Sequence, residues 1–155
     1  MLKIIGGGAL LISCILTSSY VASVEKSKID QLEDFILLIK YIRNQIDSYS
    51  APIEKIMREC KDILLRLDVQ EEITDFSQLL LAREIKSGDN CKNILHTFAD
   101  SLGKGYREQE VKLCDVTIAE LDTIRKKLTE EYPNKKKTAA ALCLAAGGAL
   151  LIALL

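Results

Sequence analysis

A chain of 155 residues has room for one domain of ordinary size, and its formal net charge of −1 gives no electrostatic reason to expect nucleic acid as a partner. The charges are unevenly placed, however. Residues 4–24 and 138–155 contain no charged side chain, whereas all 22 acidic residues and every basic residue except Lys3 lie between Glu25 and Lys137. The sequence therefore divides into two uncharged ends and a charged middle.

The first uncharged stretch predicts a transmembrane helix at 4–24. The hydrocarbon core of a bilayer is about 30 Å thick, and a helix crosses it with about 17–25 apolar residues. A cleaved signal peptide is the alternative, because the stretch follows Lys3 and ends in small residues. The apolar region of a signal peptide is only about 7–15 residues long, so a retained anchor is favoured.

The second uncharged stretch predicts another transmembrane helix at 138–155. A buried core helix and a tail that is removed are the alternatives, but the lysines at 135–137 directly before the stretch are typical of a membrane anchor. Basic residues near a membrane favour the cytoplasmic side, and they follow the first stretch and precede the second. We therefore expect residues 25–137 to form a cytoplasmic domain between two anchors.

The charged middle shows helical periodicity throughout and no alternation typical of strands. A first helix is expected to begin with Ser27 or Asp30 as its N-cap and to run to about Tyr49. A second helix begins at residues 50–52, because proline is tolerated in a first turn and the preceding Ser50 can cap exposed N–H groups.

Further capping and stop signals divide the rest of the middle. Asp68 and Glu71 resemble a capping box that opens a third helix, which extends toward Ile85. Residues 87–89 end that helix and cap a fourth one, which carries the lone histidine, His96.

Two glycines, Gly103 and Gly105, then predict a stop before a last helix over 106–132. Pro133 is expected to make an elbow at 132–134, because proline disfavours helical geometry before it and removes a backbone donor.

The apolar residues of these helices recur at three- and four-residue steps, so the fold class is expected to be an all-α helical bundle flanked by the two anchors. The residues expected to face the core are Ile29, Leu32, Phe35, Ile36, Ile39, Ile42, Ile46, Tyr49, Ile53, Ile56, Met57, Ile63, Leu64, Leu67, Ile73, Phe76, Leu79, Leu80, Ile94, Leu95, Phe98, Leu102, Val111, Cys114, Ile118, Leu121, Ile124 and Leu128.

Three cysteines, Cys60, Cys91 and Cys114, are scattered through the middle without a CxxC or Cys/His cluster that could hold zinc. An odd number of scattered cysteines predicts reduced thiols in a reducing compartment.

Sequence motifs of catalysis and cofactor binding are absent: no GxxxxGK[ST], GxSxG, HExxH or GxGxxG pattern occurs. A lone histidine such as His96 is typically a surface or packing residue. Two sets of acidic residues alternate with basic residues, which is typical of a solvated helix face. The first set is Asp62 and Asp68, and the second is Glu71, Glu72 and Asp75. We therefore predict no catalytic residue, no cofactor, no metal ligand and no small-molecule substrate.

Several local patterns together resemble a known family. They are the opening Met1-Leu2-Lys3-Ile4-Ile5-Gly6, the stretch Tyr49–Ile56 around Pro52, the Leu102-Gly103 turn before a long last helix, and lysines before a terminal apolar span. Their order over essentially the whole chain is similar to that of the stage III sporulation protein AB family of endospore-forming bacteria. The chain departs from that family's pattern at the turn, where Tyr106 replaces a usual aspartate and Glu110 occupies a glutamine position, with Gln109 one residue earlier.

The resemblance implies a fold similar to the cytoplasmic domain of the F-type inner-membrane platform proteins of type II secretion and type IV pilus systems. It also implies membership of a sporulation complex that links mother cell and forespore, with a secretion-type ATPase and other membrane subunits as partners. The location implied is the mother-cell membrane around the forespore, and a homo-oligomer is compatible with it.

Three classes of function compete for such a chain. The first is a non-enzymatic platform that docks an ATPase, with exposed arginines such as Arg83 and Arg107 as candidate docking charges. The second is an enzyme built from scattered carboxylates and His96, and the third is a membrane-anchored regulator or sensor. The missing nucleotide motif favours the platform, because a platform works beside a separate motor.

Overall fold

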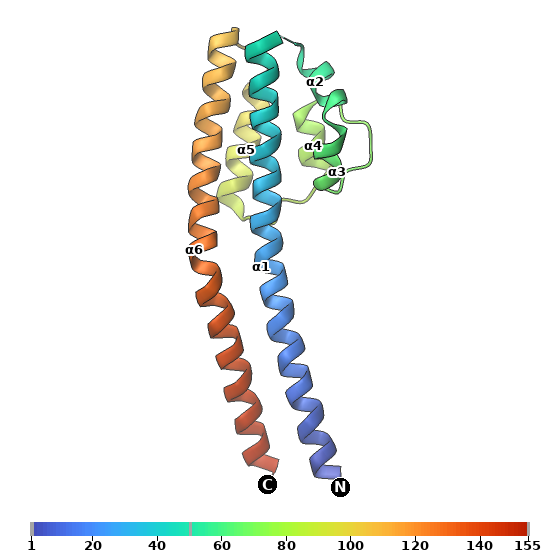
Figure 1. The fold of residues 1–155 in the computed structure, drawn as a ribbon, viewed down its shortest axis with the longest axis vertical. Coiled ribbons are helices and arrows are strands. Elements are labelled where there is room, and N and C mark those ends of the chain that lie inside the picture. The colour runs from blue at the N-terminus through green and yellow to red at the C-terminus, as the bar shows by residue number, and fades with distance from the viewer. Residues whose placement is uncertain (1, 50, 155) are drawn as a thin grey trace. The chain divides into compact units, whose positions relative to one another are not determined.

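The computed structural model describes the backbone of residues 2–49 and 51–154, and the side chains of these residues except 2–18, 144, 147 and 150–154. All regular elements in this part of the chain are helices, which confirms the all-α fold class. They are α1 (Leu2–Tyr49), α2 (Ile53–Glu59), α3 (Lys61–Arg66), α4 (Phe76–Ala82), α5 (Asp89–Ser101) and α6 (Arg107–Leu154) (Figure 1).

The chain divides into two compact units. Unit 1 consists of Met1–Ser27 and Lys127–Leu155, and unit 2 consists of Lys28–Lys126. Unit 2 therefore contains the second half of α1, the first part of α6 and all of the four shorter helices between them.

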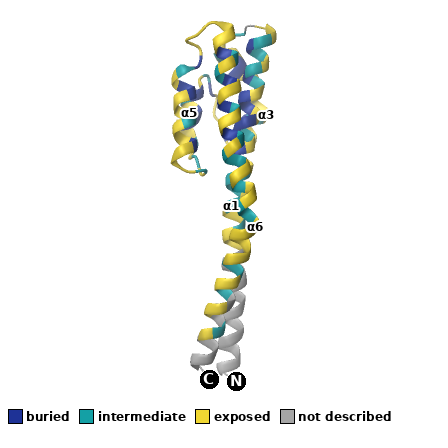
Figure 2. Ribbon diagram, turned by 90° about the vertical axis from the view of Figure 1, so that its left-hand side faces the viewer, coloured by how far each residue is buried: buried dark blue, intermediate teal, exposed yellow. Residues whose placement is uncertain are grey.

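The core of unit 2 is built on one face of α1. Leu32, Phe35, Ile39 and Ile42 are fully buried, at the three- and four-residue spacing that places side chains on one side of a helix. The buried residues, dark blue in Figure 2, recur along the other helices of the unit as well. Leu38 is fully buried although the predicted core omits it, whereas Tyr49 was predicted to be buried and is 74% exposed.

Aromatic packing joins two of the short helices. The rings of Phe76 in α4 and Phe98 in α5 meet edge to face, with centroids 4.9 Å apart. This is a favoured geometry for an aromatic pair, and both side chains are almost fully buried. The contact holds α4 and α5 together within the core.

The loop between α4 and α5 is fixed to α1 by Gln31, one of the few buried polar side chains of the described residues. Its amide nitrogen donates to the backbone carbonyl of Glu84 at 2.8 Å, and its amide oxygen accepts from the backbone N–H of Lys86 at 2.9 Å. The Ser87 hydroxyl donates to the carbonyl of Lys28 at 3.1 Å. These bonds satisfy backbone groups of the loop that are not paired within a helix.

The turn between α5 and α6 lies where the two glycines predict it. Gly103 has a φ of 82°, which a residue with a side chain rarely adopts. The buried Glu110 carboxylate accepts from the backbone N–H groups of Gly103 at 3.0 Å and Gly105 at 2.6 Å. Gln109 accepts from the N–H of Tyr106 at 3.3 Å, as the third residue of a capping box does. Gln109 and Glu110 therefore both cap backbone N–H groups of this turn.

The predicted capping box at Asp68 and Glu71 is wrong. Residues 67–75 form no helix, and α4 begins only at Phe76 and ends before Ile85. Asp68 adopts a φ of 61°, outside helical geometry. Val69 and Ile73 are buried, so this stretch is packed as an irregular segment.

Two predicted helix boundaries are also wrong. α1 runs from Leu2 without a new start at Ser27 or Asp30, and α6 continues through Pro133, so the chain has no helix break at 132–134. Proline removes only one intrahelical donor, and the flanking turns of a helix of 48 residues still hold the backbone.

Within unit 1, an ion pair joins the two long helices. The Lys135 ammonium lies 3.2 Å from a carboxylate oxygen of Glu25 in α1 and 3.2 Å from one of Glu131 in its own helix. The hydrogen bond to Glu25 is the larger cause, and that to Glu131 the next, of a raised pKa of Lys135. The Lys135 side chain therefore stays charged at neutral pH.

The side chains of the predicted spans at 4–24 and 138–155 are described only in part, because those of residues 4–18, 144, 147 and 150–155 lie outside the description. The residues that can be described contain no helical stretch with the length and apolarity needed to cross a bilayer.

Leu121→Ala should lower the free energy of unfolding by about 2–5 kcal/mol, because the Leu121 side chain is fully buried and its removal leaves a cavity. Val116→Ala is the matched control on the same helix, since Val116 is 49% exposed. Urea denaturation of residues 25–137, followed by circular dichroism, measures both. Equal costs for the two variants would contradict the packing described here.

Candidate functional site

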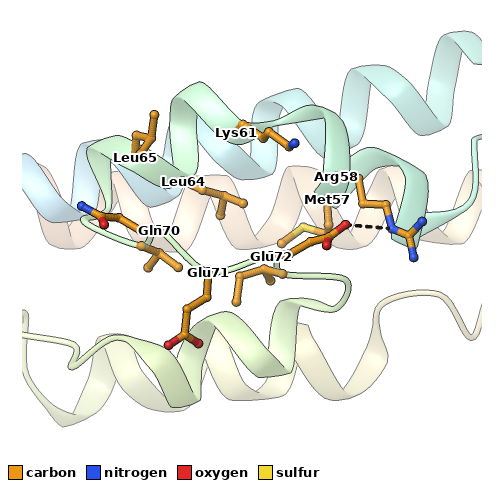
Figure 3. A pocket seen from close by; sticks show the side chains of 10 residues that line it. Met57, Arg58, Lys61, Leu64, Leu65, Gln70, Glu71 and Glu72 are labelled. Atoms are coloured by element: carbon orange, nitrogen blue, oxygen red, sulfur yellow. Dashed lines mark ion pairs between the residues drawn. The ribbon is translucent and has the colours of Figure 1, made fainter.

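One surface groove lies within unit 2, on side chains that the structure describes. It has a volume of about 250 Å³ and lies between α2–α3 on one side and the irregular stretch 69–73 on the other (Figure 3). Its lining residues are Met57, Arg58, Lys61, Leu64, Leu65, Val69, Gln70, Glu71, Glu72 and Ile73.

The floor of the groove is apolar. Met57, Leu64, Val69 and Ile73 line it, and each of these side chains is at most 5% exposed. Leu65 lies at the rim and is 58% exposed. The floor therefore belongs to the core, whereas Leu65 offers apolar surface to solvent.

Charged side chains border this apolar floor. The guanidinium of Arg58 lies 3.8 Å from the carboxylate of Glu72, and Figure 3 shows this pair joining the helical wall to the opposite wall. Both side chains are largely exposed, at 56% and 70%, so the pair contributes at most about 1 kcal/mol. Lys61 and Glu71 are further exposed charges of the lining.

Asp68 and Arg83 hold the irregular wall in place. The Asp68 carboxylate accepts from the Arg83 guanidinium at 3.1 Å. Asp68 is the one non-glycine residue of the described chain with a positive φ. The packing of this wall comes from Val69 and Ile73, which are at most 5% exposed.

This pairing changes how the candidate docking arginines are interpreted. Arg83 is only 25% exposed and braces the wall through Asp68. Arg107 contacts both the backbone carbonyl and the carboxylate of Asp47, the latter at 2.8 Å. Reversing either charge would break contacts within the fold, so neither residue is a clean probe of docking.

The other groups that the sequence singled out are not gathered at one place in the described residues. His96 is exposed on α5 and lies outside the groove. The acidic residues Asp62, Asp68, Glu71, Glu72 and Asp75 are all exposed, and only Glu71 and Glu72 line the groove. Among the described residues, no three His, Cys, Asp or Glu side chains are arranged to hold a metal ion.

The three cysteines of unit 2 are buried and unpaired with one another. Burial raises the pKa of the Cys60 and Cys91 thiols to about 11 and that of Cys114 to about 12. A protonated thiol is a poor nucleophile and metal ligand, so these side chains behave as small apolar core residues at neutral pH.

The size and lining of the groove are typical of a recognition surface. Its volume of about 250 Å³ is below the range of about 300–1,000 Å³ that is usual for small-molecule pockets. An apolar floor with charges at the rim is the pattern of a protein-binding surface, in which a buried apolar anchor is surrounded by polar contacts.

Sequence reasoning did not find this groove. The capping-box pattern of Asp68 and Glu71 predicts the start of a helix at this segment, so an irregular wall is not expected from the sequence. One available signal was composition, since residues 68–75 contain four acidic side chains and no basic one.

Comparison with known proteins gives one match. The family model described as stage III sporulation protein AB matches residues 3–155. No curated protein and no solved structure matches the chain.

Proposed function

The chain belongs to the stage III sporulation protein AB family and so has a role in sporulation, and from this premise we propose that it is a non-enzymatic membrane platform that docks a secretion-type ATPase. The family match over residues 3–155 is the observation that carries the proposal, because it covers the uncharged ends as well as the helical middle. In this proposal the platform belongs to a secretion-like complex between mother cell and forespore.

The membrane part of the proposal rests on charge. Residues 4–24 and 138–155 carry no charged side chain, and basic residues flank the inner end of each. We propose that both stretches cross the mother-cell membrane around the forespore and that residues 25–137 face the cytoplasm.

The structure of unit 2 supports docking over catalysis. The groove combines an apolar floor with exposed charges at its rim, whereas His96 stands alone on α5. A protein that works on a motor needs a stable surface, and the buried side chains of Val69 and Ile73 anchor this wall of the groove in the core.

Topology can be tested with an exposed cysteine, because the three thiols of unit 2 are buried and label slowly from either side. Lys104→Cys places a thiol on the exposed turn before α6. When the protein is produced in vegetative cells, where the outer side of the plasma membrane faces the medium, a membrane-impermeant thiol reagent should label it only after the cells are permeabilised. The unaltered protein is the control for the native cysteines. Labelling of the Lys104→Cys protein in intact cells would place unit 2 on the outer side.

The docking function can be tested by capture from sporulating cells. The full-length protein, solubilised in mild detergent, should retain the ATPase of its complex, and the purified protein should not hydrolyse ATP by itself. His96→Ala should leave both capture and spore formation unchanged, because the imidazole is exposed and lies away from the groove. Nucleotide turnover that requires His96 would replace the platform with an enzyme.

A further inference from the structure

A groove in unit 1 lies between α1 and α6 and has a volume of about 490 Å³. The residues that line it are Val21, Glu25, Glu131, Asn134, Lys135, Thr138, Ala139 and Leu142. The two helices run antiparallel here (Figure 1), so the charged residues gather at one end of the groove and Val21, Ala139 and Leu142 at the other. The groove is therefore charged at one end and apolar at the other.

One compact cluster accounts for the charged end. The Lys135 ammonium lies 3.2 Å from a carboxylate oxygen of Glu25 and 3.2 Å from one of Glu131. An ammonium that two carboxylates share attracts a further anion only weakly. The cluster therefore fixes α1 against α6 at this level, and Lys135 acts as a positioning residue.

Free positive charge lies beside this cluster. Four lysines of unit 1 are exposed and belong to no ion pair in the described part of the chain; they are Lys26, Lys127, Lys136 and Lys137. Glu130 is the one carboxylate of unit 1 that is likewise exposed and unpaired among the described residues. With the cluster included, residues 25–27 and 127–137 contain five lysines and three glutamates, so this region is positive overall.

Apolar side chains are exposed next to this band of lysines. Tyr20 is 70% exposed and Leu142 is 66% exposed, and both belong to the uncharged stretches 4–24 and 138–155. Tyrosine is enriched where a membrane meets water. Along both helices, charged surface thus gives way to apolar surface in the same direction as it does along the groove.

From the polarity of the groove and the free lysines beside it, we propose that unit 1 binds an anionic phospholipid of the cytoplasmic leaflet. An acyl chain lies along Val21, Ala139 and Leu142, and the phosphate pairs with the free lysines next to the charged end. The proposal rests on the proposed function, because lipid reaches the groove only when the uncharged stretches are in a membrane. The excess of lysine selects an anionic headgroup over a zwitterionic one, since basic residues near a membrane surface attract anionic lipid.

Lipid selectivity is measured on the full-length protein reconstituted into phosphatidylcholine vesicles. Trace amounts of spin-labelled phosphatidylglycerol or phosphatidylcholine report the lipid held at the protein surface, because a bound label moves slowly in electron spin resonance. Phosphatidylglycerol should be preferred about twofold or more, and this preference should narrow as ionic strength rises. Equal retention of the two labels would overturn the lipid site.

The charge contribution is tested by Lys136→Gln combined with Lys137→Gln, which removes two free charges and keeps the side-chain length. The preference for phosphatidylglycerol should fall toward one. The matched control is Lys104→Gln combined with Lys112→Gln, two exposed lysines of unit 2, which should keep the preference of the unaltered protein. The same loss in both double variants would show a general charge effect and overturn the site.

The groove itself is tested by Ala139→Phe, which fills the apolar end with a large side chain. Ala145→Phe is the control, because Ala145 is exposed on α6 and does not line the groove. Ala139→Phe should lower the preference for phosphatidylglycerol and Ala145→Phe should not. Circular dichroism checks that all variants are folded. An unchanged preference in folded Ala139→Phe would overturn the groove as the lipid site.

Glycerol phosphate in the buffer tests whether the lysines recognise a soluble phosphate instead. At constant ionic strength and in large excess over the labelled lipid, it should leave the preference unchanged, because it has no acyl chain to occupy the apolar end. Loss of the preference would assign the lysines to a soluble anion and overturn the lipid site.

Two further outcomes separate this site from the membrane platform. Absence of slowly moving label with both lipids would overturn the membrane platform together with the lipid site. A photoreactive amino acid in place of Ala139 should yield a product with phospholipid. A product with a second copy of this chain or with another protein instead would overturn the lipid assignment and leave the platform standing.

Discussion

The buried face of α1 is the constraint on which unit 2 depends. Leu32, Phe35, Ile39 and Ile42 are removed from water, and burial of each such side chain stabilises the fold by about 1.5–3 kcal/mol. The short helices α2 and α3 have 7 and 6 residues, below the length of about 12–15 at which isolated helices are even marginal. They exist because Ile56, Met57 and Leu64 are buried in the same core.

The groove is a consequence of the same packing. The stretch after α3 buries Val69 and Ile73 but does not complete a helix, because Asp68 turns the backbone to a φ of 61° and Arg83 holds its carboxylate. An irregular segment packed by only two apolar side chains leaves its acidic residues at the surface. Core formation and a charged rim thus arise from one stretch of sequence.

Periodic features could be predicted from the sequence. The spacing from Leu32 to Ile46 predicts the core face of α1, and Gly103 predicts the end of α5, because helical period and positive φ are local properties. The continuation of α6 through Pro133 could not be predicted. The proline is a local stop signal, but the helical segments before and after it within α6 outweigh that signal. The groove requires α2, α3 and the stretch 69–73 to meet, which no local pattern records. The two membrane spans and the ATPase partner stay predictions.

Hydrogen–deuterium exchange of the full-length protein, with and without the ATPase, tests the central claim, that the protein docks the ATPase, most directly. Because the floor and the wall are already packed, the account predicts added protection confined to backbone amides of residues 57–73. The exposed turn 103–106, at which α6 begins, should exchange at an unchanged rate. Added protection at that turn without any at 57–73, or no change on mixing with the ATPase, would contradict the account.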